Sequence, residues 1–362
     1  MPIGIENKRD MDKPLISFSI SCYNQESFIR EAVEGAFSQT YSPLEIVISD
    51  DCSKDRTFEI VQQMAAAYKG PHTVRLNRNE RNLGISGNAN RAFALCRGEL
   101  IVGAAGDDIS VPERTSITVR AWNDSGRKAT TIFSRYVVID ESGRLMEGAT
   151  EVGLSEGTIK LVHEQGNIAG FLRRRRPHIT GCACAISQKL LALFGPLPET
   201  VTYEDTAFCF RTILAGGFFT FIDAPLVKYR RHGHNITFAL HQVRPQSIAA
   251  FEDVQRKRHI ELDRYIEVYK CFAADAERAM RQGLIPPGEY PSVKKQILKE
   301  GRRFELKSEL LIRPWFRRLC IFFQLYSSTI RPRELLEHSP HLLPKTLYCA
   351  ALITRNRIPY QK

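Results

Sequence analysis

Apolar runs and helical patterns alternate along the first 240 residues of the chain. Segments such as Ile16–Ile20 and Leu44–Ser49 have the length and apolar content of buried strands. The residues between them, for example 28–37, place apolar side chains on one helical face. Strands that alternate with helices predict a doubly wound, mostly parallel α/β sheet. Further strands are expected at Thr73–Leu76, Leu100–Gly103, Thr130–Val138, Ile179–Ile186, Phe218–Ile222 and Leu226–Tyr229.

The strand pattern stops near residue 240, and the rest of the chain has a helical pattern. We therefore expect an N-terminal tail (1–14), an α/β domain (15–240) and a helical C-terminal region (241–362). The α/β domain divides into two halves, 15–110 and 111–240. Within it, helices are expected at Thr57–Tyr68, Gly87–Leu95, 112–122, Leu190–Phe194 and from Tyr203 onward.

The charge of the chain is concentrated in its last third. Residues 1–240 contain 28 Lys and Arg against 27 Asp and Glu, whereas residues 241–362 contain 23 against 13. The formal net charge of +11 therefore resides almost wholly in the helical C-terminal region. A near-neutral first part and a basic last part indicate two different tasks.

The composition is that of a globular protein in a reducing compartment. Apolar residues make up 43% and charged residues 25% of the chain. No run approaches the roughly 18 apolar residues of a membrane span, and the first residues lack the apolar core of a secretory signal. Nine cysteines without CxxC spacing suit small core residues rather than disulfides or zinc ligands. We therefore expect a cytoplasmic protein.

Three of the predicted strands end in polar residues, at 21–24, at Asp50–Asp51 and at Asp107–Asp108. Ligands of doubly wound sheets bind beyond the carboxyl ends of the strands, so we expect these residues to line one crevice. Carboxylate oxygens are the ligands that Mg²⁺ and similar hard cations prefer. Neither GxGxxG nor GxxxxGK[ST] occurs in the chain. A phosphate bound here would therefore need a metal ion.

Six short motifs follow one another between Leu15 and Asn235. They are Ser21–Asn24, Phe37–Tyr41, Asp50–Asp55, Asn82–Gly84 with Asn88–Asn90, Gly106–Asp108, and Glu204–Asp205 with Arg211. Together they resemble the bacterial inverting glycosyltransferases of family 2, which have the GT-A fold and use nucleotide-sugar donors. The resemblance implies a GT-A-like sheet with a helical basic C-terminal extension. Residues 15–110 would form the nucleotide-binding half and 111–240 the acceptor half.

Two features depart from the family pattern. Ala105 replaces the usual first acid of the DxD motif, which leaves either Asp107 or Asp108 as the principal metal ligand. The QxxRW signature of processive members is absent from the chain. Its absence argues for transfer of one sugar at a time.

The resemblance also implies which residues bind the donor. Asp107 and Asp108 would hold Mn²⁺ or Mg²⁺, with His232 and His234 as further candidate ligands near the diphosphate. Asp51 would accept a hydrogen bond from the nucleotide base. The full set of implied nucleotide-sugar contacts is Ser21, Tyr23, Asn24, Asp51, Asn82, Gly84, Asp107 and Arg211.

Several of these residues also have a purely structural interpretation. Asp50 and Asp51 could cap the helix that begins near Asp55, and Asn82 and Gly84 are common turn formers. Asp107 and Asp108 could stand in a solvated turn. The two histidines could be ordinary surface residues.

Inversion needs a general base that deprotonates the acceptor hydroxyl while the hydroxyl oxygen attacks the anomeric carbon. The resemblance assigns this role to Asp205, with Glu204 in reserve. The structural alternative is a helix start, where acids are favourable against the helix dipole. Arg173–Arg176 could clamp the donor diphosphate or an acceptor phosphate, or could form a solvated charged loop.

The basic C-terminal region contains an aromatic stripe at helical spacing. Its members are Ile312, Trp315, Phe316, Leu319, Phe322, Phe323 and Tyr326. Such a helix could lie on an anionic membrane surface, or it could pack as core against the rest of the protein. No zinc-finger, helix-turn-helix or RNA-binding signature accompanies the positive charge, so nucleic acid is not expected as a partner.

The resemblance implies metal-dependent, inverting transfer of a single hexose from a nucleotide sugar, with UDP favoured, to a hydroxyl of a glycan or lipid-linked acceptor. The process would be cell-surface polysaccharide biosynthesis, with peripheral contact at the inner face of the plasma membrane. One alternative is a nucleotidyltransferase, which would need a Gly-rich loop followed by Arg and Lys near the N-terminus; none is present. A second is a basic binding protein on a degenerate transferase domain.

Overall fold

The computed structural model describes residues 13–146, 168–173, 181–235, 248–312 and 320–321. The chain divides into two compact units, one formed by 1–231 with 274–293 and the other by 232–273 with 294–362. The long helix α9 (Ile248–Arg281) crosses this division, because its residues from Ala274 onward belong to the first unit. The division therefore differs from a simple boundary near residue 240.

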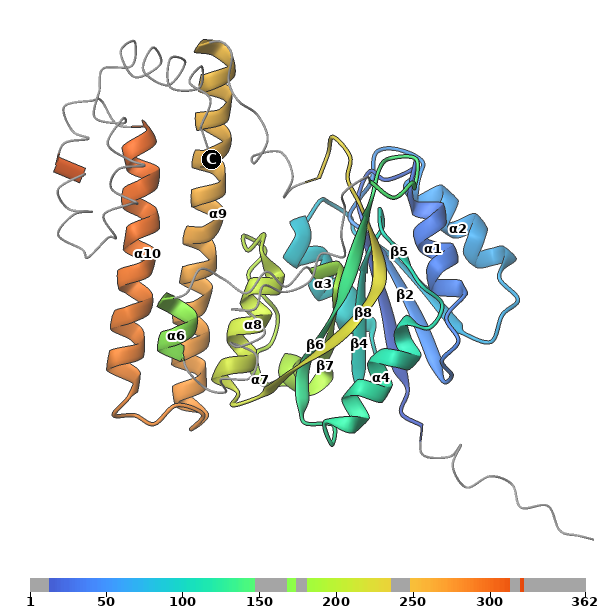
Figure 1. Cartoon of the computed structure of the whole chain (residues 1–362), viewed down its shortest axis with the longest axis horizontal. Coiled ribbons are helices and arrows are strands. Elements are labelled where there is room, and N and C mark those ends of the chain that lie inside the picture. Colours follow the sequence, from blue (N-terminus) through green and yellow to red (C-terminus); the bar gives the residue numbers. More distant parts are fainter. Residues whose placement is uncertain (1–12, 147–167, 174–180, 236–247, 313–319, 322–362) are drawn as a thin grey trace, which may run out of the picture. The chain divides into compact units, whose positions relative to one another are not determined.

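The first unit is built on one eight-stranded sheet with the order β3-β2-β1-β4-β7-β6-β8-β5 (Figure 1). The first four strands are parallel, as are β6 and β8. β7 runs antiparallel to both of its neighbours, and β5 antiparallel to β8. The predicted α/β class with a mostly parallel sheet is confirmed. The strands are β1 (Ile16–Cys22), β2 (Leu44–Asp50), β3 (Thr73–Arg78), β4 (Leu100–Ala105), β5 (Ile109–Ser110), β6 (Ala129–Ile139), β7 (Cys184–Ser187) and β8 (Phe218–Arg230).

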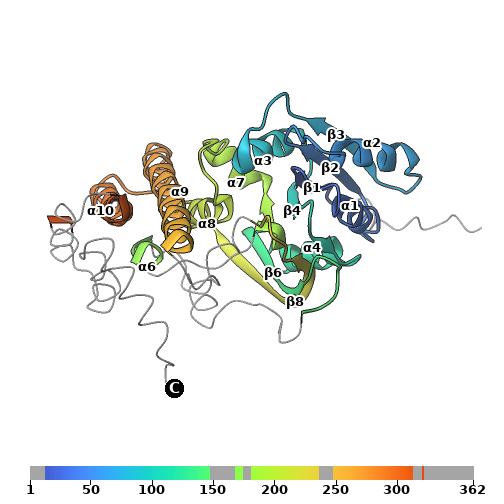
Figure 2. The same cartoon turned by 90° about the horizontal axis from the view of Figure 1, so that it is seen from above.

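Helices cover both faces of this sheet (Figure 2). α1, α2 and α4 pack on one face, whereas α3 and α7 pack on the other. α8 lies beside α3, since the rings of Phe93 and Phe208 are 5.9 Å apart. The helices are α1 (Ile29–Phe37), α2 (Thr57–Ala67), α3 (Gly84–Leu95), α4 (Arg114–Asp124), α6 (Ile168–Arg173), α7 (Gln188–Phe194) and α8 (Glu204–Leu214), with a 3₁₀ turn η1 (Gly181–Ala183) before β7.

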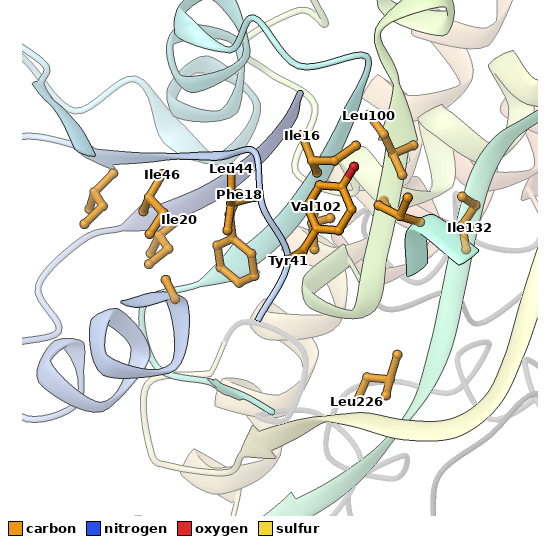
Figure 3. Close-up of a cluster of buried hydrophobic side chains, with 14 of the residues drawn as sticks. Ile16, Phe18, Ile20, Tyr41, Leu44, Ile46, Leu100, Val102, Ile132 and Leu226 are labelled. Carbon is orange, nitrogen blue, oxygen red and sulfur yellow. The ribbon is translucent and has the colours of Figure 1, made fainter. Parts of the chain in front are cut away.

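The main hydrophobic core lies between the sheet and α1, α2 and α4. β1 contributes Ile16, Phe18 and Ile20, which are fully buried. Figure 3 shows these side chains beside those of β2 and β4. Val47 and Ile101 belong to a second cluster with α3, on the opposite face. Burial on both faces explains why β2 and β4 are rich in apolar residues and why Ser17 and Ser19, the alternate residues of β1, are small and buried.

The polar strand ends meet at one edge of the sheet, as predicted. Cys22 is paired with Asp50, and Ser21 with Ala105. One residue further on, Asp51 N donates to the Cys22 carbonyl at 2.9 Å, and Gly106 N donates to the Ser21 carbonyl at 3.0 Å. The Asp50–Asp51 and Asp107–Asp108 motifs therefore lie at the same edge of the sheet, on either side of the end of β1.

Two strand predictions need correction. The segments Phe218–Ile222 and Leu226–Tyr229 form the single strand β8, whose register shifts between Ile222 and Pro225. The shift lets the strand bend at a proline that lacks a backbone donor, which the sequence shows as a break. The described part of the expected strand Ile179–Ile186 begins as the turn η1 and becomes strand only at Cys184.

The described part of the C-terminal region is helical, as expected. Its elements are α9 and α10 (Tyr290–Ile312). Within the second unit the rings of Tyr265 and Phe304 are 5.2 Å apart, and Ser308 Oγ donates to Asp263 Oδ1 at 2.7 Å. None of the helices in the described ranges has the length and hydropathy that crossing a bilayer requires. Residues 313–319 and 322–362, with most of the aromatic stripe, lie outside the described residues, as do 174–176 of the arginine run.

Candidate functional site

The loops after β1 and β2 are tied together by side chains of both. Asn24 N donates to Ser53 Oγ at 2.9 Å, and its side-chain oxygen accepts from Lys54 N at 2.8 Å. Asp55 accepts from Glu26 N at 3.1 Å. Asn24 also has a φ of 50°, in the left-handed region that asparagine tolerates. Its backbone N–H and side-chain oxygen thus join the two loops, and a nucleotide contact from this exposed residue stays a prediction.

Tyr23 and Ser21 stand differently at the same strand end. Tyr23 is 42% exposed, although it directly follows a buried strand. An exposed aromatic ring at this edge can pack against a planar base. Ser21 is half-buried, and its carbonyl oxygen accepts a hydrogen bond from Gly106 N. The geometry therefore suits a nucleotide contact from Tyr23, with Ser21 joining β1 to the acid turn.

Asp51 organises the loop that leads into α3. It is buried, and Oδ1 accepts from Asn79 Nδ2 and Leu83 N, both at 2.8 Å, while Oδ2 accepts from Gly84 N at 2.9 Å. Gly84 has a φ of +77°, and its N–H also lies 3.1 Å from Asn82 Oδ1. The predicted donor residues Asp51, Asn82 and Gly84 are thus brought together. A carboxylate offers about four acceptor sites, so one remains on Asp51 for a ligand.

Asp50 does not cap the following helix, because α2 begins at Thr57 and has no side-chain cap at its N-cap residue Arg56; it stabilises its own loop instead. Its carboxylate accepts from the N–H of Ser53 at 3.0 Å and from the Ser53 hydroxyl. Arg78 Nε lies 3.5 Å from Asp50 Oδ2. Asp50 is therefore committed to the fold of its loop, and Asp51 is the acid that faces the neighbouring loop.

Asp108 is the acid best suited to a cation. It is 4% exposed, and its Oδ1 accepts from Arg230 N at 2.8 Å. Its Oδ2 is buried without a hydrogen-bond partner among the described residues, with only the weakly donating Cys182 thiol nearby. Burial, and then the charge of Asp107, raise the pKa of Asp108 to about 8. An unpartnered buried carboxylate oxygen is costly, and a bound cation would satisfy it.

The protein offers few ligands for such a cation. No group of three His, Cys, Asp or Glu side chains within the described ranges is arranged to hold a metal. Mg²⁺ keeps several waters and is often held by one or two carboxylates together with substrate phosphates. The residues therefore fit a metal that arrives with a phosphorylated ligand, held through Asp108 Oδ2.

Arg230, which the sequence did not single out, fixes the acid turn. Its backbone N–H binds Asp108, and Nε donates to the Asp107 carbonyl at 2.9 Å. Nη2 forms an ion pair with Glu31 at 3.0 Å, and the guanidinium lies 5.0 Å from the centre of the Phe28 ring. The run of cations after β8 was visible in the sequence, but nothing there indicated which one is buried.

Arg114 is a second buried cation beneath the acids. It donates to Ser110 Oγ at 2.8 Å and to the Gly103 carbonyl at 2.6 Å. Burial lowers the pKa of Arg114 to about 10, and Asp108 is among the negative groups that oppose this shift. Its position after the acid motif, at the start of α4, is the only sequence signal for it.

Glu204 and Asp205 occupy the first turn of α8 and lie against η1. A Cβ on Gly181 would lie 2.5 Å from Glu204 Oε1, so only glycine allows this approach. Burial and then the charge of Asp108 raise the pKa of the Cys182 thiol, whereas burial and then Asp205 raise that of Cys184. The segment from η1 to β7 is therefore flanked by both acid pairs.

The two members of the second acid pair differ in character. Burial, and then the charge of Asp205, raise the pKa of Glu204 from 4.5 to about 8. The raised pKa favours the protonated form of Glu204. Asp205 Oδ1 accepts from Thr206 N at 2.6 Å. This division leaves Asp205 as the better candidate for a base, as the resemblance implied.

Arg211 needs correction as a nucleotide contact. It is 1% exposed, and its Nε and Nη2 donate to the two carboxylate oxygens of Asp275 at 2.8 and 3.0 Å. Its Nη1 donates to the Gly195 carbonyl at 2.7 Å. The guanidinium is thus bound by protein groups. The sequence could not show this, because Asp275 lies 64 residues later in a helix beyond the motifs.

His232 and His234 form a compact turn in the second unit. His234 N lies 3.3 Å from His232 Nδ1, and Asn235 Nδ2 lies 3.2 Å from His232 Nε2. Both ring nitrogens of His232 are thus near groups of its own turn. A metal-binding role for either histidine stays a prediction.

Comparisons with known proteins identify a glycosyltransferase domain in the chain. The family model "Glycosyl transferase family 2" matches residues 17–193. An uncharacterised glycosyltransferase of Methanocaldococcus jannaschii is 29% identical over 140 residues, which is 38% of this chain and 47% of that protein. Bacillus subtilis EpsE, a protein named as a glycosyltransferase, is 30% identical over 150 residues, or 40% of this chain and 53% of EpsE. The chain thus spans about half the length of these relatives.

The fold has a counterpart among solved structures. S. aureus TarS in complex with UDP-GlcNAc superposes with a TM-score of 0.55 over 94% of this chain and 88% of TarS, at 16% identity. The likeness supports the GT-A architecture that the sheet order and the strand-end acids indicate. Residues 17–193 of the chain therefore match glycosyl transferase family 2 and form a glycosyltransferase domain.

Proposed function

We propose that the protein transfers a single hexose, with inversion, from a nucleotide-sugar donor to a hydroxyl of a glycan or lipid-linked acceptor. The observation that supports this most strongly is the pair of acid sites flanking η1 and β7. Asp107 and Asp108 follow β4 beside the loops of the nucleotide-binding half. Glu204 and Asp205 begin α8 on the other side. The first pair would serve donor activation, and the second would serve deprotonation of the acceptor.

On the donor side, the chain's own residues would hold the nucleotide and the cation. Tyr23 packs against the base, and the remaining acceptor site of Asp51 takes an N–H from a pyrimidine edge. We favour UDP because the GT-A structure of TarS is in complex with UDP-GlcNAc. Asp108 Oδ2 would hold Mn²⁺ or Mg²⁺, with Asp107 beside it. When bound, such an ion neutralises the charge that develops on the leaving diphosphate.

On the acceptor side, Asp205 would take the proton of the attacking hydroxyl. The hydroxyl oxygen forms a bond to the anomeric carbon while the bond to the diphosphate oxygen breaks on the opposite face of the ring, which inverts the configuration. The proton moves to the Asp205 carboxylate, and both bonding electrons leave with the nucleotide diphosphate. The raised pKa of Glu204 reduces the negative charge that would repel the departing anion.

The basic C-terminal region supports a role at a membrane surface. It carries nearly all of the net charge of +11, and anionic lipids attract such segments. We propose that the protein binds peripherally to the inner face of the plasma membrane and extends a lipid-linked glycan in cell-surface polysaccharide biosynthesis. The family match argues against the nucleotidyltransferase alternative.

Calorimetric titration with UDP, GDP and dTDP, each with and without Mn²⁺, tests this proposal. We expect tight binding of one of them, UDP first, only when Mn²⁺ is present. Asp108→Asn should abolish the metal dependence, because it removes the charge of the cation ligand. Asp124→Asn, a substitution of an exposed acid at the end of α4, serves as the control. Absence of metal-dependent binding to all three nucleotides would overturn the proposal.

A further inference from the structure

The ion pair between Arg211 and Asp275 is unusually well buried. Among the ion pairs of the described residues, it is the one in which both side chains are less than one-tenth exposed, at 2% and 6%. Removing one partner of such a pair leaves the other charge buried and uncompensated, so the geometry is strongly enforced. Arg211 lies six residues after Asp205 on the same helix, α8.

Side chains of α8 and of the end of α9 also bind the end of α7. Arg211 donates to the Gly195 carbonyl at 2.7 Å. Arg278 donates to the Phe194 carbonyl, and Gln282 Nε2 donates to the Leu193 carbonyl at 2.9 Å. These are the carbonyls of the last two residues of α7 and of its C-cap residue Gly195, and such carbonyls have no partners inside their own helix. The first-unit part of α9 thus caps α7 and binds α8 through two charged groups.

The loop that follows α7 is held equally firmly on its other side. Asn90 of α3 exchanges two hydrogen bonds with the backbone of Leu197, at 2.7 and 2.9 Å. Arg81 forms an ion pair with Glu199 at 2.9 Å. α3 begins at Gly84, whose N–H is bound by Asp51. A series of direct contacts therefore joins the loop before α3, which Asp51 binds, through residues 195–199 to Arg211 and α9.

We propose that Arg211 and Asp275 are positioning residues, which fix α8 so that Asp205 faces the nucleotide-sugar donor. The end of α9 (274–281) and Gln282 are then part of the catalytic unit, although they lie far outside the family match of 17–193. This inference rests on the proposed function, because it takes Asp205 as the base. It predicts that breaking the pair slows turnover and leaves donor affinity unchanged.

Hydrogen exchange on the full-length chain tests the structural half of the inference without any substrate. In Asp275→Asn, the amides of residues 204–214 should exchange faster than in the wild type, while those of α2 keep their protection. Asp275→Glu retains the charge and should restore much of the protection. Arg211→Lys provides the same test from the other partner if Asp275→Asn does not fold. Unchanged exchange in α8 would overturn the inference.

Turnover and binding test the catalytic half. Release of nucleotide diphosphate from a UDP-sugar should fall by about 10²-fold in Asp275→Asn, since a displacement of about 1 Å at a reacting group has this effect. The Kd for UDP with Mn²⁺ should stay within twofold of the wild-type value, and Asp275→Glu should recover turnover. If turnover in Asp275→Asn falls no more than in the control variant Glu45→Gln, the positioning role is contradicted.

Glu45→Gln serves as the control for general destabilisation. Glu45 is a buried carboxylate near Arg75, at the start of β2, and it accepts from Ser17 Oγ at 2.6 Å. Its loss should lower the melting temperature without affecting α8. Failure of the proposed function would show itself separately, as a wild-type protein that neither binds nor cleaves any nucleotide sugar, while the exchange experiment still decides whether the ion pair fixes α8.

Discussion

At the scale of single residues, neighbouring acids of the same type have different tasks because their surroundings differ. Asp50 accepts a hydrogen bond from Ser53 in its own loop, whereas Asp51 binds the loop before α3. The motifs indicated these positions correctly. They could not show that Asp108 keeps one unpartnered oxygen, because the group that binds the other oxygen, Arg230 N, lies 122 residues later. Contacts that distant have no local pattern.

The assignment of Asp205 as the base gives the first prediction. Asp205→Asn should reduce sugar transfer by about 10²- to 10⁴-fold, because the amide cannot accept the proton of the acceptor hydroxyl. Binding of the nucleotide with Mn²⁺ should be unchanged. Turnover assays together with calorimetry measure both quantities. Transfer that survives in Asp205→Asn would show that the base is another group.

The raised pKa of Glu204 gives a prediction for stability against pH. The folded chain binds more protons than the unfolded chain between about pH 4.5 and pH 8, because the pKa of Glu204 rises from 4.5 to about 8 on folding. The free energy of unfolding should therefore fall as pH rises through this window, by at most about 1.4 kcal/mol per pH unit. Glu204→Gln should flatten the curve. Chemical denaturation of both proteins across the window measures it, and parallel curves would refute the assignment.

At the scale of elements, the sequence predicted the parallel strands well and the antiparallel ones poorly. β1, β2 and β4 are rich in apolar residues, and their shared edge could be inferred from topology alone. The direction of β7 and the two-residue strand β5 depend on contacts with distant partners. The turn η1 before β7 matters most, since it separates the two acid pairs and nothing in its residue pattern predicted its shape.

Gly181 in η1 tests that arrangement. Gly181→Ala would place a methyl group 2.5 Å from Glu204 Oε1, so the Glu204 side chain must move. We expect a stability loss of only about 0.5–1.5 kcal/mol, because a side-chain end can shift, but a fall in turnover of at least about tenfold. Gly288→Ala, where a Cβ meets nothing within 4 Å, is the matched control. Equal turnover in both variants would argue against close packing of Glu204 on η1.

At the scale of the whole molecule, the boundary between catalytic and C-terminal parts was the hardest feature to predict. The change from strands to helices near residue 240 was correct, but α9 contributes its last residues to the first unit. That contribution depends on the pair between Arg211 and Asp275, which joins two helices far apart in the sequence. The family motifs end before the second of them begins.

The charge distribution gives a prediction for the whole chain. Removing residues 311–362 should lower the fraction that sediments with phosphatidylglycerol vesicles, because these residues carry basic side chains beside an aromatic stripe. Neutral phosphatidylcholine vesicles serve as the control and should bind little of either protein. An undiminished fraction on anionic vesicles would eliminate the peripheral membrane role.

The configuration of the first sugar released tests the central claim most directly. The full-length protein would be incubated with Mn²⁺ and a set of α-linked donors, UDP-glucose, UDP-galactose, UDP-GlcNAc and GDP-mannose, with water as the acceptor. Proton NMR of the earliest product, before mutarotation, should show the β-anomer from the donor that is cleaved, and no product from Asp205→Asn. An α-anomer as the first product would contradict inversion and, with it, Asp205 as the base.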